Sequence, residues 1–146
     1  MHKARQQRFA LRVALYVLRH KGCDQPTKNQ VLNFMIRKRF IQIPEEEMER
    51  RRDSDREEIW RNDLCWKRKD LFEDGEVDSP ERGKWSLTKH GISKIETSKE
   101  QWLKLSDLDE QRRVLEQLDY FTPELIQWLL KIARGDDLSR RAIAHS

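Results

Sequence analysis

The stretch IWRNDLCWKRKDLFEDGEVDSPERGKWSLTKHG, residues 59–91, carries the strongest fold signal in this sequence. Its first half predicts a helix over roughly Asp55–Glu73, because glycine and proline are absent until Gly75, a common helix-ending residue. One face of this helix carries three large apolar residues, Trp60, Leu64 and Leu71. Trp66 lies off that face, and we expect it to pack on neighbouring helices rather than to stack on a base.

A β-hairpin is predicted directly after this helix. Two short strands, 77–79 and 84–87, flank the turn residues Pro80 and Gly83. In the second strand Trp85 and Leu87 alternate with polar residues, so one side of the hairpin is apolar. A two-stranded hairpin is marginally stable in water, so this side must pack on the helices, and we expect Trp60 and Trp85 in the core.

Two helices are predicted before this stretch. Apolar residues recur at helical spacing over about 4–19, and again after Thr27, which has the position of an N-cap. The segment 45–58 is almost wholly charged, and we interpret it as a solvated connector with a short helix over 45–51. The order of helix, helix, helix and hairpin is that of a winged helix-turn-helix.

The remainder of the chain is predicted to be helical. Thr88 should cap a helix that runs to about Leu105, Ser106 should cap the next, and Thr122 with Pro123 should begin the last. The fold class is therefore mainly α with a small β-hairpin, a winged helix-turn-helix followed by C-terminal helices. We divide the chain into a winged-helix DNA-binding domain, a helical extension that forms a dimer or packing element, and a flexible tail: 1–97, 98–135 and 136–146.

Composition narrows the class of protein. Charged residues make up 38% of the chain and hydrophobic residues 36%, with no apolar run long enough to span a membrane. The two cysteines, Cys23 and Cys65, fit neither a disulfide framework nor a zinc site, and the four histidines are scattered. We therefore expect a reduced, cytoplasmic setting, no membrane contact, and no metal or other cofactor.

Basic residues are concentrated in two blocks. Residues 1–40 contain ten Lys or Arg and one acidic residue, Asp24, and residues 79–94 contain four basic residues and one acidic residue. If folding places the two blocks side by side, they form a cationic face suited to phosphates. The alternative is that these charges only keep the protein soluble.

Residues Phe9–Glu96 resemble the N-terminal winged-helix domain of Mrr-type restriction endonucleases. The resemblance rests on spaced residues of the helix, Asn62, Trp66, Leu71 and Gly75, and of the wing, Ser79, Pro80, Arg82, Gly83, Trp85, Leu87, Thr88 and Gly91. The family usually has a basic residue where this chain has Asp63 and a small one where it has Lys67. These departures bear on base contacts more than on the fold.

The resemblance implies a targeting function. In that family the winged helix guides a separate nuclease domain, often towards modified DNA. A nuclease domain would bring an acidic, metal-binding core with a nearby lysine, and this chain shows no such motif. We therefore expect no enzymatic activity in the chain itself, which either lacks the nuclease or is a piece of a protein that has it.

We predict nine DNA-contacting residues, in three groups. They lie on the third helix, on the wing and at the start of the second helix: Arg61, Asn62, Arg68 and Lys69; Arg82 and Lys84; Thr27, Lys28 and Asn29. Asn pairs well with adenine and Arg with guanine, while Lys and Arg also bind phosphates. The alternative interpretations are an ordinary charged helix surface, a turn role for Arg82 and simple capping by Thr27.

The leading functional hypothesis is a specificity module of a restriction-type system that reads duplex DNA. The wing and the first forty residues should supply much of the affinity, and the third helix the discrimination. A winged-helix transcriptional regulator is one alternative. A protein-interaction module is another, because the helices over 106–134 are able to form a dimer interface and acidic residues near the third helix oppose phosphates.

Overall fold

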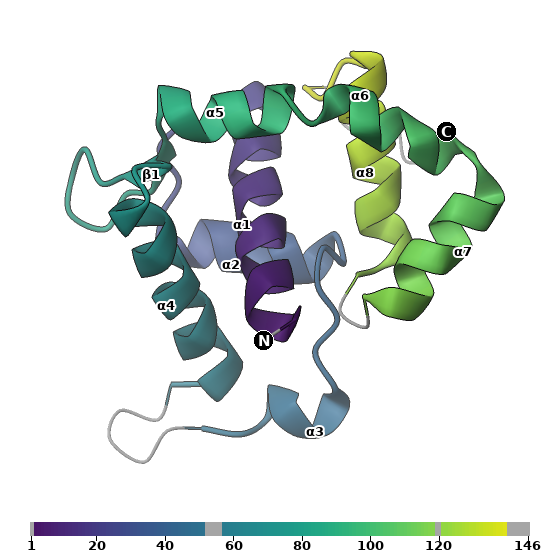
Figure 1. Ribbon diagram of the computed structural model, residues 1–146. Helices are drawn as coiled ribbons and strands as arrows, with labels where there is room; N and C mark the ends of the chain where they lie inside the picture. Colours follow the sequence, from purple (N-terminus) through teal and green to yellow (C-terminus); the bar gives the residue numbers. More distant parts are fainter. Residues whose placement is uncertain (1, 52–56, 119–120, 140–146) are drawn as a thin grey trace.

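The computed structural model describes residues 2–51, 57–118 and 121–139 (Figure 1). Its elements, in chain order, are α1 (His2–His20), α2 (Lys28–Arg37), α3 (Glu45–Met48), α4 (Ile59–Glu73), β1 (Val77–Asp78), β2 (Ser86–Leu87), α5 (Lys89–Glu96), α6 (Lys99–Trp102), the 3₁₀ helix η1 (Leu103–Ser106), α7 (Leu108–Gln117) and α8 (Pro123–Arg134). The strands β1 and β2 pair antiparallel, with Val77 opposite Leu87. The predicted fold class, mainly α with a small hairpin, is confirmed.

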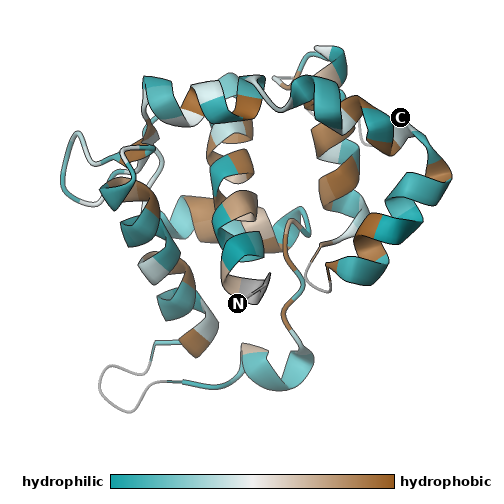
Figure 2. Cartoon of the chain, in the orientation of Figure 1, coloured by the Kyte–Doolittle hydropathy of each residue, from teal (hydrophilic) through white to brown (hydrophobic). Residues whose placement is uncertain are grey.

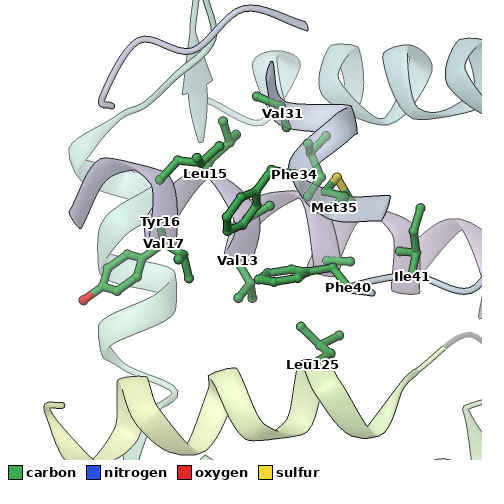
Figure 3. Close-up of a cluster of buried hydrophobic side chains, with 14 of the residues drawn as sticks. Val13, Leu15, Tyr16, Val17, Val31, Phe34, Met35, Phe40, Ile41 and Leu125 are labelled. Carbon is green, nitrogen blue, oxygen red and sulfur yellow. The ribbon is translucent and has the colours of Figure 1, made fainter. Parts of the chain in front are cut away.

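The core is built around α1. This helix packs on α2, α4 and α5, and its apolar face holds Val13 and Val17 fully buried. Figure 3 shows Val13 beside Phe40, which follows α2, and Leu125 of α8 on the other side of Phe40. Because Leu125 is also fully buried, α8 belongs to the same core as α1, α2 and α4. The domain boundary at residue 97 stays a prediction.

A third β segment joins the hairpin to the start of α2. Thr27 forms an antiparallel bridge with Lys84, and the backbone N–H of Trp85 donates to the carbonyl oxygen of Pro26 at 2.8 Å. This pairing was not predicted from the sequence, because the two residues Pro26 and Thr27 are too few to show the alternation of a strand. The pairing fixes the hairpin against the N-terminus of α2. Trp60 and Trp85 are both buried, as predicted.

Several helix boundaries differ from those predicted. The helix after Thr88 does not run to Leu105 but ends at Glu96, and α6 and η1 follow as separate short turns. Asp107, not Ser106, caps α7, because its carboxylate accepts the N–H groups of Asp109 and Glu110. Thr88 and Thr122 cap the N-termini of α5 and α8, as predicted, and the left-handed Gly135 ends α8.

The connector before α4 also differs from its prediction. The short helix ends at Met48 rather than Arg51, and α4 begins at Ile59 because Glu58 is extended. Arg51 and Glu58 form a β-bridge across this connector. Asp55 and Arg56, the first residues of the predicted helix, lie outside the described residues. The part of the expected tail beyond Ser139 also lies outside them. Within the described start of that tail, Leu138 is buried.

Some large apolar side chains lie on the surface. Trp66 is 53% exposed on α4, so the prediction that it packs on neighbouring helices is wrong. Leu108, the first residue of α7, is 73% exposed. In the part of the chain that the structure describes, no helix is long and apolar enough to cross a membrane.

Candidate nucleic-acid interface

The predicted site residues lie on three neighbouring elements. The β-bridge between Thr27 and Lys84 brings the wing to the first turn of α2. The helix α4 contacts both α2 and β1. Figure 1 shows α4 and the hairpin side by side at one edge of the molecule, and Figure 2 shows α4 as a mostly hydrophilic helix. The structure therefore brings all three predicted groups of residues to one region.

Thr27 acts as a helix cap. Its hydroxyl accepts the backbone N–H of Gln30 at 3.2 Å, and the Gln30 side chain accepts the backbone N–H of Thr27 at 2.8 Å. This is a complete capping box, and it satisfies two backbone donors at the helix end. The hydroxyl of Thr27 is thus engaged within the protein, which favours the capping interpretation for this residue.

Lys28 is bound by an acidic residue that precedes α4. Its Nζ lies 2.8 Å from both carboxylate oxygens of Glu57. Burial by itself lowers the pKa of Lys28, but the hydrogen bond that Lys28 donates to Glu57 and the negative charge of that carboxylate outweigh burial and raise it. Burial also raises the pKa of Cys65, which keeps it a neutral thiol near pH 7. The sequence pattern contained no signal that Glu57 would reach Lys28.

Arg61 joins α4 to α2. Its guanidinium donates to Asn33 Oδ1 at 2.6 Å and to Asn29 Oδ1 at 3.3 Å, and it lies 4.7 Å from the centre of the Trp60 ring. These contacts hold the first turn of α4 against the exposed side of α2. Two of the predicted DNA contacts, Asn29 and Arg61, therefore already bind each other in the free protein.

The solvent side of α4 is a ridge of four residues. They follow at helical spacing: Asn62, Trp66, Lys69 and Glu73. The Nζ of Lys69 lies 5.0 Å from the centre of the Trp66 ring and 4.0 Å from a carboxylate oxygen of Glu73. Asn62, at the start of the ridge, is half-buried. The ridge thus presents an amide, an indole and a partly neutralised ammonium group to a ligand.

Arg68 lies between the ridge and the wing. Its guanidinium carbon is 5.7 Å from the centre of the Trp85 ring and 5.9 Å from that of Phe72, and Phe72 is 47% exposed. The Nε of Arg68 is buried and has no hydrogen-bond partner among the described residues. Aromatic rings hold this side chain in place without neutralising its charge.

The wing supplies two more cations. Arg82 is exposed at the turn, and Lys84 is half-buried where the wing meets α2. Gly83 between them has a φ of 80°, a conformation that favours glycine, so the turn holds the two cations on either side of it. Within the described ranges, the structure shows no ion pair for Arg68, Arg82 or Lys84.

The basic first forty residues contribute less to this region than expected. Arg8 pairs with Asp70 at 3.4 Å, and the Nε of Arg12 lies 2.5 Å from a carboxylate oxygen of Glu76. Glu76 is only 1% exposed, and it also binds Lys94 at 3.6 Å. The sequence did not reveal this buried carboxylate. Several cations of the two basic blocks therefore hold α1, β1 and α5 together instead of forming one open cationic face.

Comparison with known proteins assigns the fold to a family. The model of the Mrr N-terminal domain matches residues 9–97, which is more than half of the chain. The chain belongs to the Mrr N-terminal domain family. No curated protein and no solved structure matches it.

The Mrr N-terminal match confirms the resemblance that the helix and wing motifs suggested, and it covers α4 and the whole wing. The family model describes an N-terminal domain and not a nuclease domain. Among the described residues, no three His, Cys, Asp or Glu side chains are placed to hold a metal ion.

Proposed function

We propose that this Mrr N-terminal domain binds duplex DNA as the targeting module of a restriction-type system. The observation that carries the proposal is a set of cations at the junction of α4 and the wing that have no acidic partner among the described residues: Arg68, Arg82 and Lys84. DNA phosphates bind such cations and release condensed counterions, which drives association. Elsewhere on the domain, cations such as Arg8 and Arg12 already have carboxylate partners.

The arrangement of the elements suits a duplex. The major groove is about 12 Å wide and admits one helix. The ridge of α4 faces solvent, and no other element of the described residues lies over it. With α4 in the groove, Arg82 and Lys84 of the wing reach the flanking backbone. Asn62 is then the amide that lies on the side of α4 facing the bases, and Lys69 a contact to phosphate or base.

The cleavage step belongs, in this proposal, to a nuclease domain or subunit that this domain guides. The targeting role is supported by the family of the domain. A transcriptional regulator would use the same DNA contacts. The family favours the restriction role, and a pull-down for an associated nuclease from the native host separates the two.

A salt titration of duplex binding tests the proposal. The logarithm of the association constant should fall linearly with the logarithm of the salt concentration, by about 0.9 per phosphate neutralised. The double variant Arg82→Ala/Lys84→Ala should reduce this slope by about two phosphates and weaken all sequences equally, whereas Asn62→Ala should flatten sequence preference. If neither plain nor modified duplexes bind at low salt, the proposal fails.

Self-association is a second candidate function, carried by the exposed Leu108 on α7. Leu108 is 73% exposed and no residue of α7 is buried, so a second copy that covered this face would remove apolar surface from water. Sedimentation velocity over a concentration series should show a dimer that Leu108→Ala weakens. A monomer at every concentration would remove this candidate.

A further inference from the structure

Trp66 is the most exposed of the five tryptophans and lies at the middle of α4. Its exposed fraction is 53%, whereas Trp60 and Trp85 are buried in the core. Exposing an indole to water costs free energy that most proteins avoid by burying it, at roughly 25 cal/mol per Å² of apolar surface. A ligand that covered the indole would remove this apolar surface from water, which favours binding.

The position of Trp66 identifies the ligand that would cover it. The helix α4 spans Ile59–Glu73, so Trp66 has seven residues on either side and projects from the centre of the ridge. Lys69 and Arg68 lie on the same half of the helix, and both are held by aromatic rings. An apolar centre flanked by cations complements the floor of a groove whose edges carry phosphates.

We propose that Trp66 is a specificity-determining residue of α4, beside Asn62, and that its indole packs on the C5-methyl group of a thymine in the major groove. This inference rests on the proposed function. The thymine methyl is the apolar feature of the major groove of unmodified DNA, and nonpolar side chains recognise it by contact. An indole covers more apolar surface than any other side chain and fits such a site.

The neighbours of Trp66 support this geometry. Asn62 lies one turn earlier on the same ridge, and an amide in the groove pairs with adenine. The Nζ of Lys69 lies 5.0 Å from the centre of the indole ring, a contact that favours this position of the ring in the free protein. The two ridge residues together select a step that contains an adenine–thymine pair.

Binding of a selected duplex tests the inference. The wild-type domain first enriches its preferred sequence from a random duplex pool, and fluorescence anisotropy then measures affinity for that duplex. Each thymine is replaced in turn by uracil, which removes only the methyl group. One position should show about a fourfold loss of affinity, which corresponds to the roughly 0.8 kcal/mol of one buried CH₂ group.

Variants at position 66 assign the loss to the indole. Trp66→Ala should lose about tenfold or more in affinity and should become insensitive to uracil at the critical position, while Trp66→Phe should keep part of both effects. Leu103→Ala is the matched control, because it removes an exposed apolar side chain from η1 and should change neither. Circular dichroism of each variant checks folding.

Indole fluorescence gives an independent readout of contact. The selected duplex should quench the emission of the wild-type protein and protect it from acrylamide, and both changes should be lost in Trp66→Phe. The inference is overturned if the duplex binds but uracil substitution and Trp66→Ala leave the affinity unchanged. It is also overturned if the methyl that matters belongs to 5-methylcytosine at a position where thymine is not accepted. Absence of all duplex binding would instead refute the proposed function.

Discussion

Gly91 is a residue at which the fold tolerates no side chain. A Cβ atom there would collide with the backbone carbonyl oxygen of Glu76 and lie 2.9 Å from Cδ2 of Leu87. Gly91→Ala should therefore destabilise the domain by about 2–3 kcal/mol, because α5 would have to move away from the hairpin. Urea unfolding followed by circular dichroism measures this. Ser93→Ala, on the exposed side of the same helix, should change stability by less than about 0.5 kcal/mol, and an equal loss would contradict the explanation.

Arg12 and Arg8 lie one turn apart on α1 but differ in what they hold. Arg12 is the closest partner of Glu76, a carboxylate that is 1% exposed, whereas the Arg8–Asp70 pair is open to solvent. Arg12→Ala should cost about 2–3 kcal/mol, because it leaves the buried carboxylate with only Lys94. Arg8→Ala should cost at most about 1 kcal/mol. Thermal melts of both variants test the difference, and similar losses would show that Glu76 needs no buried partner.

At the scale of elements, two neighbouring residues, Ser106 and Asp107, are candidates for the N-cap of α7. Asp107→Ala should destabilise the protein by about 1 kcal/mol, because its carboxylate satisfies two N–H groups of the first turn of α7. Ser106→Ala, the matched control, should cost less than about 0.5 kcal/mol, since the Ser106 hydroxyl donates only to the carbonyl oxygen of Leu103 at the surface. Denaturant titration distinguishes them, and a larger effect at Ser106 would restore the cap that the sequence predicted.

Local patterns predicted the helices and the hairpin, but not where tertiary contacts interrupt them. Thr27 and Thr122 cap the helices that directly follow them, so their sequence neighbourhoods were sufficient to predict the caps. The break after Glu96 was not visible, because 98–106 keeps a helical composition and the chain turns there to bring Trp102 and Leu105 into the core. The pairing of Thr27 with Lys84 joins residues far apart in sequence, which local reasoning cannot detect.

At the scale of the whole molecule, the position of the candidate site could be predicted from the sequence, but the ion pairs within and around it could not. All three groups of predicted residues meet beside α4, because a winged-helix order places them there. The distribution of charge was less predictable, since ion pairs such as Arg12–Glu76 and Lys28–Glu57 join distant segments. Trp66 could be placed off the buried face from its helical phase, yet its exposure depends on the absence of a neighbouring element, which only the structure shows.

The Lys28–Glu57 pair gives a prediction about the whole interface. If DNA binds across α4 and the start of α2, Glu57 both occupies Lys28 and repels the approaching phosphate. Glu57→Gln should therefore tighten duplex binding several-fold at low salt and increase the salt slope by about 0.9, because one more lysine becomes available to a phosphate. Fluorescence anisotropy over a salt series measures both quantities.

A charge-matched control separates release of Lys28 from a general change in net charge. Glu81→Gln removes one exposed acidic charge from the wing turn, where the described residues show no ion pair for Glu81. It should raise affinity modestly and leave the slope unchanged, since it frees no cation. If both variants have the same effect, net charge explains the result. If Glu57→Gln weakens binding, Glu57 positions Lys28 for the duplex rather than competing with it, and the start of α2 contacts DNA only with that pair intact.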